Sequence, residues 1–200
     1  MEFNFFTFIF LLAILTSVLA LLWLNFRQDR AIKISFNEVP EGFKETITLE
    51  DHQKAGQYTQ AKLLVNHFEI IFSTIVLLIW TVGGAMNWLD IFWHERISDP
   101  ILLGTTFILS IMLIASFIDL PFSIYRNFIL EERFGFNRMT IKTFTGDLIK
   151  ELILTLALGM PLIYAILYLM NMNAIGDYWW IYVWIILSLF TITMMWIYPT

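Results

Sequence analysis

The chain has 200 residues, of which 58% are hydrophobic and only 14% are charged. A soluble domain carries about a quarter charged residues, so this chain has more apolar surface than one soluble core can bury, and lipid must solvate much of it. The net charge of −5 is spread over several loops, which excludes a basic nucleic-acid surface, and the absence of cysteine excludes disulfides and thiolate chemistry. The composition predicts an integral membrane protein.

Five uncharged runs are each long enough to cross a hydrocarbon layer about 30 Å thick as a helix. Helices satisfy their backbone hydrogen bonds within one segment, so we predict an all-α, polytopic membrane protein with five transmembrane helices. The predicted spans are residues 3–26, 68–89, 100–120, 152–172 and 178–198.

The first run has two readings, a secretory signal or an uncleaved anchor. Its short N-terminal region carries Glu2 and no Lys or Arg. The apolar stretch is also too long for a signal core. The anchor is therefore favoured.

The distribution of Lys and Arg predicts the orientation. The four connections between the spans hold six, one, five and zero of these residues in chain order. By the positive-inside rule the first and third connections are cytoplasmic, which puts the N-terminus outside and the C-terminus in the cytoplasm.

The first connection and the second span carry helix signals. The sequence Thr48-Leu49-Glu50-Asp51 has the form of a capping box and predicts a surface helix that runs into the second span, although Gly56 argues against it. The second span ends in Gly83-Gly84-Ala85, small residues that favour close helix packing. Tryptophans near the second and fifth spans are typical of an interfacial aromatic belt.

A segment with both signs of charge, residues 119–151, lies between the third and fourth spans. Pro121 marks where the third span leaves the lipid, and the helical period continues towards Gly135, which is placed to end the helix. Asn137 is placed to cap a new helix that leads through Asp147 and Lys150 into the fourth span. We predict a cytoplasmic helical hairpin with its tip at residues 131–133.

The histidines do not make a zinc motif. His94-Glu95 begins like H-E-x-x-H, but Ser98 occupies the place of the second histidine. His52 and His67 are predicted on the opposite side of the membrane. We therefore expect no metal ligands and no catalytic residues in this chain.

The sequence leaves open whether two acidic residues near the span ends, Asp119 and Glu69, are functional or structural. Acids within membrane segments are candidates for function, but Asp119 and Glu69 both lie close to the surface. A structural ion pair between Asp119 and Arg126, two turns further on, is favoured over a functional role.

The central segment resembles a known family. The run Leu120-Pro121-Phe122-Ser123-Ile124-Tyr125, then Phe128-Ile129-Leu130-Glu131-Glu132-Arg133-Phe134-Gly135-Phe136-Asn137, is similar to the N-terminal membrane region of type I CAAX prenyl proteases, which are zinc metallopeptidases. Leu130 and Glu131 stand where that family commonly has Ile-Glu or Val-Glu. The resemblance implies a family signature, and an interface with a catalytic domain, at Pro121, Tyr125, Glu131, Glu132, Arg133, Phe134, Gly135, Phe136, Asn137, Thr140, Asp147 and Lys150.

The resemblance covers nearly all of residues 1–200, but only the front of such an enzyme. The H-E-x-x-H helix, the third zinc ligand and the catalytic domain would follow Thr200, so zinc is implied only for a full-length enzyme. The spans would form part of a chamber wall that positions a protein or peptide substrate. The implied partners are the lipid bilayer, the missing catalytic domain and that substrate, and this chain alone is expected to be inactive.

Other readings stay open at this point. The first connection, with Val39-Pro40-Glu41-Gly42-Phe43, resembles the bacterial branch, which implies the bacterial inner membrane and general membrane-protein quality control rather than prenylated substrates. A stand-alone, non-catalytic membrane protein that acts by interaction is the alternative. A small transporter is weaker, because the spans lack deep charges and paired half-helices.

Overall fold

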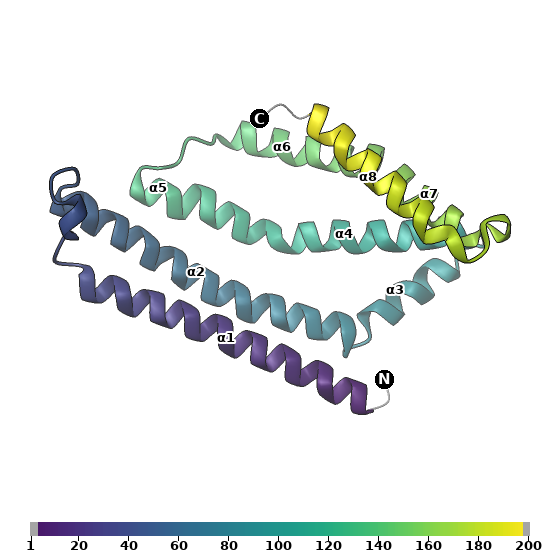
Figure 1. The fold of residues 1–200 in the computed structure, drawn as a ribbon, viewed down its shortest axis with the longest axis horizontal. Helices are drawn as coiled ribbons and strands as arrows, with labels where there is room; N and C mark the ends of the chain where they lie inside the picture. The colour runs from purple at the N-terminus through teal and green to yellow at the C-terminus, as the bar shows by residue number, and fades with distance from the viewer. Residues whose placement is uncertain (1–3, 198–200) are drawn as a thin grey trace. The chain divides into compact units, whose positions relative to one another are not determined.

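The computed structural model describes residues 4–197, and for residues 173–175 the backbone only. Within this range the chain folds into helices without any strand (Figure 1). The outermost residues of the first and last predicted spans, 3 and 198, lie outside the described part.

Five helical stretches in the described part are long and apolar enough to cross a membrane, which confirms the predicted number. They are Phe5–Ser35, Leu49–Thr81, Pro100–Phe134, Ile141–Asn171 and Gly176–Ile197. At most 11% of the residues in the apolar window of any span are buried. Side chains this apolar and this exposed need lipid around them.

The chain divides into two compact units, one made of residues 1–87 and 119–139 and the other of residues 88–118 and 140–200. In the first unit the complete elements are α1 (Phe5–Ser35), η1 (Glu41–Phe43), α2 (Leu49–Thr81), η2 (Arg126–Leu130) and α5 (Glu131–Phe134). Helix α4 (Pro100–Tyr125) enters this unit at residue 119.

Helices α1 and α2 run antiparallel, side by side (Figure 1). The predicted N-cap at Thr48 is confirmed, because Thr48 Oγ1 accepts from Asp51 N at 3.1 Å, while Asp51 Oδ2 accepts from the Thr48 hydroxyl at 2.6 Å. Gly56 does not interrupt α2: a Cβ there would lie 3.3 Å from side-chain atoms of Ile32 and Phe36, so the glycine permits close contact with the end of α1.

The second span ends next to Gly83-Gly84-Ala85, close to the predicted end, but the two glycines terminate the helix and contact no neighbouring helix among the described residues. Helix α2 ends at Thr81, the Gly83 N–H reaches back to the Leu78 carbonyl at 2.8 Å, and Gly84 has a φ of +82°. A positive φ suits glycine and stops the helix. The apolar run predicted over residues 68–89 is therefore split between the end of α2 and the start of α3 (Ala85–His94).

The helix that begins at Pro100 continues as far as Phe134, past the predicted span. Pro121 lies inside α4 and supplies no backbone N–H, and one turn later η2 forms a π turn. There the Glu131 N–H donates to the Arg126 carbonyl, five residues back.

The second unit completes the chain. Beyond its parts of α3 and α4 it comprises α6 (Ile141–Leu154), the π turn η3 (Thr155–Gly159), α7 (Met160–Asn171), η4 (Asn173–Tyr178) and α8 (Trp179–Ile197). A Cβ at Gly104 would lie 2.9 Å from Leu167 Cδ1, so α4 and α7 approach closely at this glycine. The Trp93 indole donates to Ser110 Oγ at 3.0 Å, which ties α3 to α4.

Candidate functional site

The segment with the family signature lies against α2 in the first unit. The ring of Phe122 is 5.2 Å from that of Phe72, and further on Arg126 reaches Glu69. Leu130 and Phe134 are both buried, with 5% and 9% of their surface exposed. Every fourth residue of this segment, from position 122 to position 134, therefore lies on the face that packs in the first unit.

The π turn explains how positions 122, 126, 130 and 134 stay on one face. In an ideal α-helix each residue turns by about 100°, so a step of four residues drifts by about 40°, and three steps drift by about 120°. One extra residue in the turn at η2 takes back about 100° of this drift. This turn was not predicted from the sequence, because a π turn has no characteristic residue pattern.

Gly135 ends the helix in the predicted way. Its φ of +76° is left-handed, its N–H donates to the Glu132 carbonyl at 3.0 Å, and the Phe136 N–H donates to the Glu131 carbonyl at 2.9 Å. This pair of bonds is a Schellman motif, which reverses the chain after Phe134.

Two aromatic rings of the signature, one before and one after the reversal, contact Tyr58 of α2. Phe134 and Phe136 meet the Tyr58 ring edge-on, with centroid distances of 5.3 and 5.0 Å. Two lysines of α2 lie over these rings, Lys54 at 5.4 Å from the Phe136 centroid and Lys62 at 5.3 Å from that of Tyr58. We call Tyr58, Phe134 and Phe136 the aromatic clamp. Tyr58 was not predicted as a site residue.

The predicted helix cap at Asn137 is wrong. The Asn137 side chain instead bridges the loop: its Oδ1 accepts from Met139 N at 2.7 Å, and its Nδ2 donates to Glu132 Oε2 at 2.9 Å. Thr140 caps α6, because its Oγ1 accepts from Thr143 N at 3.1 Å. Asn137 is thus satisfied inside the loop and leaves the capping position to Thr140.

The remaining signature residues lie in two separate places. Pro121, Tyr125 and Arg133 line an apolar groove of about 510 Å³ along α2 in the first unit. Asp147 and Lys150 lie on α6 in the second unit, where Lys150 Nζ donates to Asp147 Oδ1 at 3.2 Å, as their spacing predicts.

The predicted pair of Asp119 with Arg126 is also wrong. Arg126 Nη2 lies 2.9 Å from Glu69 Oε1, whereas Asp119 is exposed and forms no ion pair with any described residue. The Glu69 oxygen is buried, and its contact with Arg126 is an ion pair without hydrogen-bond alignment. Glu69 directly precedes the apolar run of α2 that begins at Ile70. Its carboxylate is partly buried and is balanced by Arg126, whereas Asp119 is exposed to solvent.

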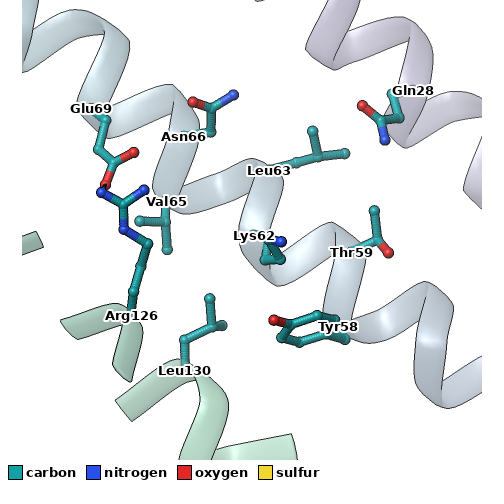
Figure 2. Close-up of a pocket in the computed structure, with 10 residues that line it drawn as sticks. All are labelled: Gln28, Tyr58, Thr59, Lys62, Leu63, Val65, Asn66, Glu69, Arg126 and Leu130. Atoms are coloured by element: carbon teal, nitrogen blue, oxygen red, sulfur yellow. Dashed lines mark ion pairs between the residues drawn. The ribbon is translucent and has the colours of Figure 1, made fainter. Parts of the chain in front are cut away.

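A polar pocket of about 340 Å³ opens beside this ion pair (Figure 2). It is lined by one residue of α1, a stripe of α2 at helical spacing and two residues of η2: Gln28; Tyr58, Thr59, Lys62, Leu63, Val65, Asn66 and Glu69; Arg126 and Leu130. The sequence signal for this pocket is the recurrence of polar side chains at positions 58, 62, 66 and 69, which share one face of α2 ahead of the span.

The described residues do not fit a zinc centre. Among residues 4–197 no three His, Cys, Asp or Glu side chains gather as a metal site would require. Each histidine has a ring nitrogen near a backbone carbonyl of its own unit: His52 with Ser35 at 2.9 Å, His67 with Leu63 at 2.6 Å and His94 with Asp90 at 3.1 Å.

The fold and this packing define an all-helical, polytopic integral membrane protein. The model of the family described as CAAX prenyl protease N-terminal, five membrane helices, matches residues 28–200, and the chain belongs to this family.

The comparisons with individual proteins agree with this. The CAAX prenyl protease 1 homolog of Dictyostelium discoideum is 33% identical over 89% of this chain and 42% of its own length. That of Caenorhabditis elegans is 35% identical over 89% of this chain and 39% of its own length. The crystal structure of S. mikatae Ste24p superposes with a TM-score of 0.79 at 25% identity, covering 92% of this chain and 43% of that one. The chain thus spans about two fifths of the length of these relatives.

Proposed function

We propose that this chain is the membrane-embedded scaffold of a zinc metalloendopeptidase, the part that forms a chamber wall and positions a protein or peptide substrate. The observation that carries the proposal is the family match over residues 28–200, together with the packing of signature residues 122–136 on α2. The relatives are named as proteases, and the matched region is less than half of their length.

The zinc chemistry belongs to a catalytic part outside residues 1–200, because the donors described here do not fit a zinc centre. A zinc ion held there would activate a water molecule for hydrolysis of a peptide bond. This chain's share is to hold the signature segment rigid through the aromatic clamp and the ion pair of Arg126 with Glu69.

Two acidic residues of the signature, Glu131 and Glu132, are proposed as part of the contact with the catalytic part. Glu131 is half-buried at the start of α5, and Glu132 is exposed and held by Asn137. The basic connections favour a cytoplasmic position for this face. The likeness of the first connection to the bacterial branch supports the bacterial inner membrane and a role in protein quality control.

The experiment begins with the full reading frame that contains this chain. We expect the full-length protein to bind one equivalent of zinc and to cleave a fluorogenic peptide substrate, prenylated or not, whereas residues 1–200 alone bind none and cleave nothing. One equivalent of zinc on residues 1–200 would overturn the proposal. A reading frame that stops at Thr200, with no proteolysis, would favour the stand-alone interaction protein.

A substitution tests the proposed contact with the catalytic part. In the full-length enzyme Glu131→Gln should reduce peptide cleavage without changing thermal stability, while Glu41→Gln, in the exposed turn η1, should leave cleavage unchanged. Equal effects of the two substitutions would remove Glu131 from the contact.

A further inference from the structure

The polar pocket of Figure 2 lies where three helices leave their apolar runs. Gln28 follows the run of α1 that ends at Phe26, and Lys62 and Asn66 precede the run of α2 that begins at Ile70. Arg126 follows the run of α4 that ends at Ile118. Residues in these positions lie at the level of the lipid head groups. All three helical segments belong to the first unit.

The lining of the pocket is rich in hydrogen-bond donors. Lys62 and Arg126 are cations, and Gln28, Asn66, Thr59 and Tyr58 add amide and hydroxyl groups. Glu69 is the single carboxylate in the lining, and Arg126 balances its charge at 2.9 Å. Lys62 contacts the Tyr58 ring and forms no ion pair with any described residue, so it leaves one cation of the pocket uncompensated.

An apolar groove adjoins the pocket. Val65 and Leu130 line both, and beyond them the groove of about 510 Å³ is walled by Phe68, Phe122 and Ile129. Phe68 and Ile129 are 69% and 52% exposed. A donor-rich pocket beside an exposed apolar groove matches a ligand with an anionic head and a hydrocarbon tail.

We propose that this pocket binds the phosphate head group of an anionic phospholipid from the adjacent leaflet. Basic pockets between membrane helices on the cytoplasmic side favour such lipids, and each Lys or Arg near the surface contributes about 1 kcal/mol, or roughly fivefold in affinity. Lys62, Asn66 and Gln28 hold the phosphate, and one acyl chain lies in the groove. The proposal does not depend on the proteolytic role.

The experiment measures binding of radiolabelled dihexanoyl-phosphatidylglycerol to the full chain in a neutral detergent by scintillation proximity. Lys62→Gln should weaken binding about fivefold. Lys44→Gln removes the same charge from an exposed loop, where Lys44 pairs with Glu38 at 3.3 Å, and should leave the Kd unchanged. Glu69→Gln should tighten binding, because it removes the carboxylate that competes for Arg126.

Competition separates the sources of phosphate. Dihexanoyl-phosphatidylcholine and inorganic phosphate, at the concentrations used for phosphatidylglycerol, should displace little of the label. Displacement by inorganic phosphate would mean a free-anion site and overturn the lipid assignment. Equal binding of the two lipids, or equal losses from Lys62→Gln and Lys44→Gln, would overturn the site itself. A weaker Kd in Glu69→Gln would contradict the assigned role of its carboxylate.

Discussion

At the scale of single residues, Gly135 decides where the signature segment turns. Its backbone is left-handed, and apart from its two chain neighbours no described residue has a heavy atom within 4 Å of the Cβ position. A side chain at this position would clash with none of these residues, so a substitution would change the stability only through the backbone conformation. In an L-residue this conformation costs about 1–2 kcal/mol.

We therefore predict that Gly135→Ala lowers the free energy of unfolding by about 1–2 kcal/mol. Gly146→Ala is the matched control, because Gly146 is inside α6 with open space around its Cβ position. There alanine should raise the stability by up to about 1 kcal/mol. Thermal unfolding in detergent measures both, and a loss of stability in both variants would contradict the conformational account.

Tyr58 holds both rings of the clamp. Each edge-to-face pair contributes about 0.5–1.5 kcal/mol beyond the buried area. Tyr58→Leu removes two such pairs and should destabilise the chain by about 1–3 kcal/mol, whereas Tyr58→Phe keeps both contacts and should be close to neutral. The comparison is made by thermal unfolding, and a large loss in Tyr58→Phe would show that the hydroxyl, not the ring, matters.

Local signals predicted some residues and not others. Thr48 and Gly135 were predicted correctly, because a cap and a left-handed glycine depend on neighbours within one helical turn. The partner of Arg126 was not predicted correctly, because it lies on another helix and because two acids, Glu69 and Asp119, both lie near the ends of predicted spans. Asn137 failed as a cap because its amide finds partners in the loop.

At the scale of elements, the ion pair of Glu69 and Arg126 links α2 to η2. Arg126 is 48% exposed and Glu69 21% exposed, so solvent screens the pair and its loss should cost only about 1 kcal/mol. Glu69→Arg or Arg126→Glu alone places two like charges side by side. We predict that each single reversal destabilises the chain and that the double reversal recovers most of the loss.

A double-mutant cycle of unfolding midpoints measures this coupling. Additive losses in the double variant would show that the two side chains do not interact. Asp119→Asn is the control, since Asp119 lines the neighbouring pocket of about 350 Å³ without an ion pair to any described residue, and it should leave the coupling unchanged.

At the scale of the whole molecule, composition and run length predicted the helical class and the five spans, because a bilayer admits few structures. The contacts between helices were not predictable in the same way. A helix that is apolar on all sides has no apolar stripe to mark the face that packs against another helix. In lipid that face is determined by small residues and by pairs of polar side chains. Gly104 against α7 is an example.

The predicted orientation has a direct test, because the chain contains no cysteine. Single substitutions Lys44→Cys, Arg138→Cys and Glu95→Cys place one thiol in each of three connections. An impermeant maleimide should label the first two from the cytoplasmic side only and the third from the opposite side. Labelling of positions 44 and 138 from different sides would contradict the positive-inside assignment.

The π turn at η2 has a consequence for the length of the chain. A turn that holds one surplus residue can lose it: with Asn127 deleted, positions 122 and 134 are eleven steps apart, and at about 100° a step their side chains differ in direction by only about 20°. A chain shortened there should still close the clamp, whereas deletion of Ala61 in the regular part of α2 should not. Single-residue length differences between natural variants of this protein should therefore gather at residues 126–130.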